Sequence, residues 1–157
     1  MKINVRTLKT IALAVGLAVF VVSCASVPDA SPEQKQQALS FSPPPNMAGL
    51  YVIRPYHIAG SAVSWVVKLD YQDFGSLGTS SYLYSAVLPG KHFIRMGVNG
   101  DYGMETFVAE AGKNYYFTMK PSLSGHIFDQ ISETEGQQDV RDFKMSGASS
   151  YKVPFNP

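Results

Sequence analysis

The chain is poor in cysteine and histidine. Its 157 residues include one cysteine, Cys24, and three histidines, His57, His92 and His126. One cysteine excludes an intramolecular disulfide, and histidines about 35 residues apart, without a His-x-x-x-His pair, give no metal-ligand spacing. Stability must therefore come from a packed core, for which nine Tyr, nine Phe and one Trp supply the apolar bulk.

A strong charge of either sign is also lacking. The chain has 13 basic and 12 acidic residues, and Lys2, Arg6 and Lys9 all precede Cys24. From Cys24 onward the net charge is therefore −2, which provides no electrostatic basis for binding nucleic acid or anionic headgroups. No glycine-rich phosphate loop is present, and the stretch 75–78 has the wrong length for a Gly-x-Ser-x-Gly nucleophile turn. We therefore predict no cofactor.

The N-terminus has the pattern of an export signal. Three basic residues precede the apolar run Ile11–Val22, which ends at Ser23 and Cys24. The run is short of the roughly 20 residues that span a bilayer comfortably, so an uncleaved membrane anchor is the weaker interpretation. The order Val21-Val22-Ser23-Cys24 resembles the bacterial lipobox.

The lipobox resemblance implies a defined maturation. Residues 1–23 would be a signal peptide cut between Ser23 and Cys24, and the Cys24 sulfur would carry a diacylglyceryl group. Because Ala25, and not aspartate, follows the cysteine, the resemblance implies the outer membrane of a Gram-negative-type bacterium. Residues 24–47 are polar and rich in proline, and we interpret them as a flexible tether with a short helix over 32–39, capped by Ser31.

Beyond residue 48 the apolar residues alternate with polar ones, as in half-buried strands. Turn residues separate the runs, and Pro89-Gly90 predicts a hairpin between two of them. We predict strands over 50–54, 62–70, 81–88, 91–98, 105–110, 115–120 and 126–131, with 71–75 as a turn. Six or seven strands of this kind favour an all-β fold: a small antiparallel β-sandwich over 48–145, or else a small open barrel. A short helix over 137–143 and a flexible tail over 146–157 complete the chain, while Gly136 speaks against a helix that begins at Ser132.

Three short segments occur in an order that resembles a bacterial domain of unknown function, often found on lipoproteins. They are Tyr51-Val52-Ile53-Arg54-Pro55, Leu88-Pro89-Gly90-Lys91-His92 and Ala111-Gly112-Lys113-Asn114-Tyr115-Tyr116. In that family the second segment often begins with a proline where this chain has Leu88. The resemblance covers roughly residues 48–135 and implies a small β-sandwich, with no activity attached.

The tyrosines are the candidate binding residues. Tyr82 and Tyr84 share one strand face, and the adjacent Tyr115 and Tyr116 lie on opposite faces, so we expect one of that pair to be exposed. Such rings either fill the core or form a platform, together with His92, for a peptide, a glycan or a protein partner.

These observations favour a non-enzymatic binding or structural module displayed at the outer membrane, on its periplasmic or its surface side. The expected partners are the membrane through Cys24, and another envelope protein or cell-wall glycan, but no nucleic acid. The alternative is a small envelope hydrolase or metal-binding protein that uses His57, His92 or His126. An accessory subunit of a secretion or cell-wall complex is a third possibility.

Overall fold

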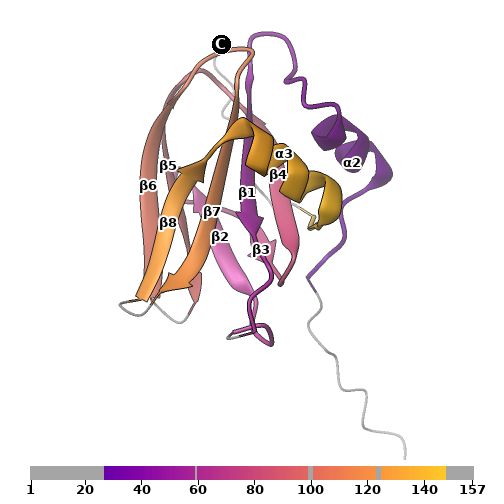
Figure 1. Cartoon of the computed structure of the whole chain (residues 1–157). Coiled ribbons are helices and arrows are strands. Elements are labelled where there is room, and N and C mark those ends of the chain that lie inside the picture. Colours follow the sequence, from indigo (N-terminus) through magenta and orange to yellow (C-terminus); the bar gives the residue numbers. More distant parts are fainter. Residues whose placement is uncertain (1–26, 59, 99–100, 123–124, 148–157) are drawn as a thin grey trace, which may run out of the picture.

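The computed structural model describes residues 27–58, 60–98, 101–122 and 125–147, and the element labels follow Figure 1. The predicted signal peptide with Ser23, the lipidation site Cys24, and residues 148–157 of the predicted tail lie outside the described residues. The described elements are α2 (Pro32–Leu39), β1 (Ala48–Arg54), β2 (Trp65–Leu69), β3 (Gln72–Leu77), β4 (Ser81–Val87), β5 (Gly90–Val98), β6 (Asp101–Ala109), β7 (Asn114–Ser122), β8 (Gly125–Ile131), α3 (Glu133–Asp142) and β9 (Lys144–Met145).

The strands form two sheets that face each other, so the predicted small β-sandwich is confirmed (Figure 1). One sheet has the order β8-β7-β1-β4-β9, and the other has the order β3-β2-β5-β6. Alternate residues of both sheets fill the space between them, including Leu50, Val67, Ile94 and Phe117. At one edge the sandwich closes tightly, because Gly103 of β6 lies against Phe128 of β8.

The structure has nine strands in its described part, and not the predicted six or seven. Strand β3 occupies the stretch 72–77, most of which we predicted as a turn. Asp70 and Tyr71 both have positive φ, at 49° and 66°, which is the backbone geometry of a tight two-residue hairpin turn. Neither residue is the glycine that usually marks such a turn, so the turn is hard to predict from the sequence.

The predicted hairpin across Pro89-Gly90 is wrong. Strand β4 pairs with β1 and β9, whereas β5 pairs with β2 and β6. The Pro89-Gly90 segment therefore carries the chain from one sheet to the other. The sandwich is also not wholly antiparallel, since β1 pairs with β7, and β4 with β9, in parallel.

Part of the predicted tether belongs to the folded domain. Helix α2 forms where we predicted it, with Ser31 and Gln34 in a reciprocal capping box. Ala38 at its end is fully buried, and Asn114 donates a 2.7 Å hydrogen bond from Nδ2 to the carbonyl oxygen of Phe41. These contacts correct the expectation of a flexible spacer, because burial and hydrogen bonding hold this stretch against the sheet.

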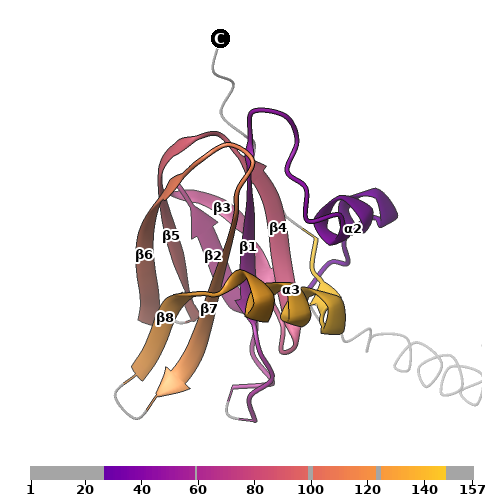
Figure 2. The ribbon, with the colours of Figure 1, turned by 45° about the horizontal axis from the view of Figure 1, so that its top comes forward.

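Helix α3 begins at Glu133, capped by Ser132, and continues through Gly136. The expectation that Gly136 prevents this helix is wrong. Only a residue without a side chain fits there, because a methyl group would overlap the ring of Tyr116. Both helices cover the outer face of the five-stranded sheet, so the molecule has three layers (Figure 2). The outer face of the four-stranded sheet carries no helix within the described residues (Figure 2).

Candidate functional site

Three of the four candidate tyrosines belong to a second core, and not to a binding platform. Tyr82, Tyr84 and Tyr116 are buried with Tyr51 between the five-stranded sheet and the two helices. The Tyr51 ring stacks on Tyr116 with centroids 4.7 Å apart and lies 4.8 Å from the centroid of Tyr84. Burial raises the pKa of Tyr116 to about 12 and also raises the pKa of Tyr51. The strand pattern alone could not show that helices cover this face.

Tyr115 lies on the opposite face of β7, as we predicted, but it is half-buried. Its ring centroid is 5.0 Å from that of Phe107, and its hydroxyl accepts a 3.0 Å hydrogen bond from the backbone N–H of Glu110. Neither member of the Tyr115–Tyr116 pair is therefore an exposed aromatic. Both faces of the five-stranded sheet are covered, one by the second sheet and one by the helices.

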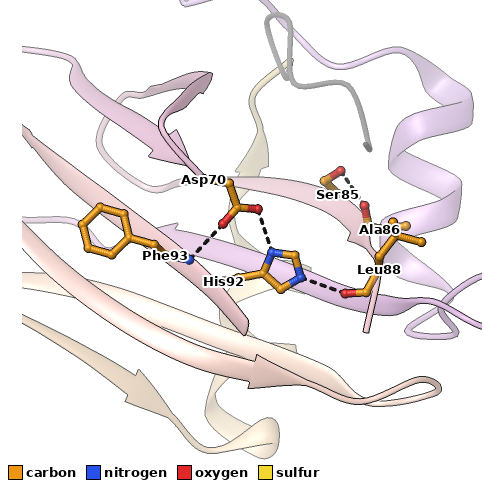
Figure 3. A network of polar contacts seen from close by, with 6 residues as sticks. All are labelled: Asp70, Ser85, Ala86, Leu88, His92 and Phe93. Carbon is orange, nitrogen blue, oxygen red and sulfur yellow. Dashed lines mark hydrogen bonds and ion pairs between the residues drawn. The ribbon is translucent and has the colours of Figure 1, made fainter. Parts of the chain in front are cut away.

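His92 is buried at the start of β5, with its side chain 8% exposed. Its Nδ1 lies 2.7 Å from a carboxylate oxygen of Asp70, and its Nε2 lies 2.7 Å from the carbonyl oxygen of Leu88 (Figure 3). The second Asp70 oxygen accepts a 3.0 Å hydrogen bond from the N–H of Phe93. The network ties the β2–β3 turn to β5.

The two His92 contacts limit what the ring can do. Carboxylate and carbonyl oxygens only accept, so each contact requires a proton on the ring nitrogen that makes it. A general base or a metal ligand needs a ring nitrogen with a free lone pair facing the substrate or the ion. In this arrangement neither ring nitrogen of His92 is free for these roles. The prediction that His92 belongs to an exposed binding surface is wrong, because its side chain is buried.

The described side chains bring no other candidate histidine to His92. His57 is exposed in the loop after β1, and the side chain of His126 lies outside the described residues. Asp73 pairs with Lys68 at 2.8 Å. Across the described part of the chain, no three His, Cys, Asp or Glu residues come together in a group that could hold a metal ion.

Sequence reasoning missed a pocket at the end of β1. It has a volume of about 360 Å³ and is lined by Arg54, Pro55, Tyr56, His57, Trp65, Met119 and Lys120. The guanidinium of Arg54 is buried and lies 4.1 Å from the centre of the Trp65 ring, so the face of the indole stabilises the positive charge of Arg54. The Arg54-Pro55 pair in the first resemblance segment was the available signal, but sequence could not show what it contacts.

Arg54 organises the loop that joins β1 to β2. It donates hydrogen bonds of 2.6 Å to the carbonyl oxygens of Gly60 and Val63, and of 2.8 Å to that of Leu77. Burial lowers the pKa of this guanidinium. Since a guanidinium has five N–H donors in a rigid fork, one side chain can satisfy several loop carbonyls at once.

The third resemblance segment also makes hydrogen bonds to the backbone of a distant part of the chain. Gly112 adopts φ of +80° and donates to the carbonyl oxygen of Met47 at 2.8 Å. The carbonyl oxygen of Lys113 accepts from the N–H of Gly49 at 3.0 Å. Together with Arg54 and His92, these contacts place residues of all three segments in backbone-organising roles, and none of the contacts provides a reactive group.

The uncovered face of the four-stranded sheet carries an exposed aromatic side chain at the turn between β2 and β3. Tyr71 is 77% exposed and stacks on Phe93 with ring centroids 5.2 Å apart. Met104 and Val108 of β6 are also exposed. The strand register places Lys68 and Arg95 on this face as well, so it mixes aromatic, apolar and charged side chains, as binding surfaces do, and it lies on the side of the molecule away from the helices (Figure 2).

Comparisons with known proteins place the chain beside a relative of unassigned role. It is 29% identical over 140 residues to an uncharacterized protein of Haemophilus influenzae, a match that spans 84% of this chain and 81% of that protein. No protein-family model matches the chain, and no solved structure gives a significant match. Neither α2 nor α3, the helices of the described residues, is long and apolar enough to cross a bilayer.

Proposed function

We propose that this chain is a lipid-anchored protein of the bacterial envelope whose β-sandwich is a non-enzymatic binding or structural module at the outer membrane. The observation that carries the proposal is the export pattern that ends at Cys24, directly ahead of a folded domain whose described part begins at Val27. Two or more acyl chains on one cysteine would hold such a domain at a bilayer, since a single chain binds only marginally.

The described side chains support the non-enzymatic part of the proposal. His92 has both ring nitrogens engaged, and the buried tyrosines pack against helices. The exposed Tyr71 face of the four-stranded sheet is the region we expect to meet an envelope protein or a cell-wall glycan. Crosslinking from a photoreactive residue at position 71 in intact cells would identify that partner, and a crosslinker at the exposed Leu39 of α2 is the matched control.

Cys24→Ser in the full chain tests the anchor. We expect the precursor to stay at the inner membrane with its first 23 residues attached, as mass spectrometry and membrane fractionation would report. Ser23→Ala keeps a small residue before the cut and should mature normally. A Cys24→Ser chain that matures and fractionates with the outer membrane would show that the anchor is not at Cys24.

The alternative is a small envelope hydrolase or metal-binding protein that uses His57, His92 or His126. The His92–Asp70 pair is the observation in its favour, since a histidine held by a carboxylate is the usual partner set of a base or a zinc ligand. Histidine NMR signals followed during zinc addition separate the two proposals. The non-enzymatic proposal expects the His92 signals to stay in place, whereas the alternative expects a histidine to shift at stoichiometric zinc.

A further inference from the structure

The chain enters the domain very close to Cys24. Only three residue steps separate Cys24 from Val27, which at full extension spans roughly 11 Å. The residues that follow are held in place: Pro28 accepts a 2.7 Å hydrogen bond from Gly147, and Asp29 pairs with Lys144 at 2.6 Å. A lipid on Cys24 would therefore keep this end of the domain at the bilayer surface, and not at the end of a long spacer.

The loop between β1 and β2 lies at the same end of the molecule (Figure 1). Ser61 of that loop and Val27, at the start of the described chain, line the same surface depression. The strand pairing supports this placement. Arg54 at the end of β1 lies opposite Ser81 in β4, and Ser81 lies opposite Lys144 in β9. Lys144 is the ion-pair partner of Asp29. The loop therefore starts within a few strand spacings of the point where the chain arrives from Cys24.

This loop exposes apolar side chains that the domain itself does not use. Ile58 is 78% exposed, Tyr56 is 62% exposed, and Val63 is 42% exposed. Arg54 holds the carbonyl oxygens of Gly60 and Val63, so the described apolar residues lie beside backbone that is fixed by hydrogen bonds. Backbone that is already fixed loses little conformational entropy when it meets a surface.

We propose that Tyr56 and Ile58 insert into the interfacial region of the bilayer beside the lipid on Cys24. The inference rests on the proposed function, because the anchor brings the loop to the membrane. Tyrosine suits the headgroup level, with an apolar ring and a polar hydroxyl, and isoleucine suits the acyl boundary below it. The loop thereby sets the orientation of the domain on the membrane, with β1 directed toward the bilayer.

The insertion does not depend on anionic lipid. Two cations near this end are paired with acids, Lys144 with Asp29 and Lys120 with Glu135, and the guanidinium of Arg54 is buried against loop carbonyl oxygens. No basic patch is therefore offered to headgroups by this set of residues, and the interaction should be as strong on neutral as on anionic vesicles.

The test uses the full lipidated chain with one introduced thiol. Because the lipid occupies the sulfur of Cys24, Ile58→Cys or Tyr56→Cys provides the free thiol for an environment-sensitive fluorophore. The matched control is Val108→Cys, which is 64% exposed in β6 next to the turn that contacts Met47, at the opposite end of β1. The purified protein is reconstituted into vesicles of phosphatidylethanolamine and phosphatidylglycerol, and separately of phosphatidylcholine, each with brominated acyl chains.

We expect several-fold stronger quenching by the brominated chains at positions 58 and 56 than at 108, in both kinds of vesicle. If all three labels stay open to aqueous iodide on protein that carries lipid and floats with the vesicles, the loop inference is wrong and the anchor stands. If mass spectrometry finds no lipid on Cys24, both proposals fall. If position 58 is shielded in native envelope membranes but not in protein-free vesicles, a protein partner covers the loop and the lipid assignment is overturned.

Discussion

The hydroxyl of Tyr51 in β1 donates a 2.7 Å hydrogen bond to the carbonyl oxygen of Ala38, at the end of α2. Both residues are fully buried, and the bond joins the start of the described chain to the middle of the five-stranded sheet. It is the clearest sign that the segment ahead of β1 is part of the fold. The helix therefore covers the tyrosine face that would otherwise be open to solvent.

Tyr51→Phe should lower the free energy of unfolding by about 1 kcal/mol, because it removes the hydrogen bond but keeps the ring. The loss stays modest since the Ala38 carbonyl oxygen also accepts from the N–H of Phe41. Chemical denaturation measures the change. Tyr56→Phe, at an exposed ring, is the control and should change stability by less than about 0.5 kcal/mol. Equal effects at both positions would contradict a structural role for this bond.

Gly136→Ala should destabilise the domain by about 1–3 kcal/mol, although alanine is the better helix former. The added methyl group would overlap the ring of Tyr116, which is itself buried beneath α3. The matched control is Gly78→Ala, where no atom beyond the two neighbouring residues lies within 4 Å of the new methyl group. If Gly136→Ala raised the thermal midpoint, α3 would not sit on Tyr116 as described.

Arg54→Met should cost about 2 kcal/mol or more, since it removes charge-assisted hydrogen bonds to three carbonyl oxygens. The effect should concentrate in the loop after β1, where amide hydrogen exchange would become faster than in the strands. Lys91→Met removes an exposed cation of β5 and should leave exchange in this loop unchanged. Uniform acceleration across both sheets would point to a global role for Arg54.

Asp70→Ala should cost roughly 2–3 kcal/mol, and Asp70→Asn about half of that. Alanine removes the acceptors of His92 and Phe93 and must adopt a φ of 49°, whereas asparagine tolerates that backbone and keeps one acceptor. Asp73→Asn, at an exposed ion pair, should be nearly neutral. Denaturant midpoints of the three variants should follow this order. An Asp70→Ala variant as stable as the parent chain would show that the network does not contribute to stability.

The buried tyrosines predict a loss of stability at alkaline pH. Burial raises the pKa of Tyr116 from 10.0 to about 12, and it also raises the pKa of Tyr51, Tyr82 and Tyr84. The unfolded chain releases these protons first, so stability is intact below pH 10 and falls as the pH rises from 10 toward 12. Each such phenol contributes a slope of roughly 1.4 kcal/mol per pH unit.

The alkaline transition can be followed by phenolate absorbance and circular dichroism together. The four buried phenols should ionise only as the β-sheet signal is lost. Tyr116→Phe should make the fall in stability less steep, while Tyr56→Phe should leave it as it is. Complete ionisation of all tyrosines ahead of unfolding would contradict the buried cluster.

Local signals in the sequence predicted local structure well. Alternation marked most strands, and Ser31 marked the start of α2, where the structure adds the reciprocal cap of Gln34. Strand pairing is harder to predict: the turn chemistry of Pro89-Gly90 favours a hairpin, yet β4 and β5 belong to different sheets. A turn residue restricts the backbone near itself, but it does not choose which strand becomes the neighbour.

The candidate site was predicted less well for the same reason. The aromatic faces of β4 and β7 were recognised, but whether Tyr82, Tyr84 and Tyr116 meet water or helices depended on segments far away in the chain. The engagement of both His92 nitrogens required Asp70, 22 residues earlier. No spacing rule connects these positions.

The sequence by itself determined the alternating strands, the capped helix before them and the absence of an intramolecular disulfide, because side-chain period, capping chemistry and cysteine count can be read without the fold. The lipid attachment at Cys24 is likewise a prediction from sequence. Only the tertiary structure decided the order of strands, the burial of the tyrosines and the exposure of Tyr56 and Ile58. Those features depend on which distant segments pack over each apolar surface, and that packing exists only in the folded chain.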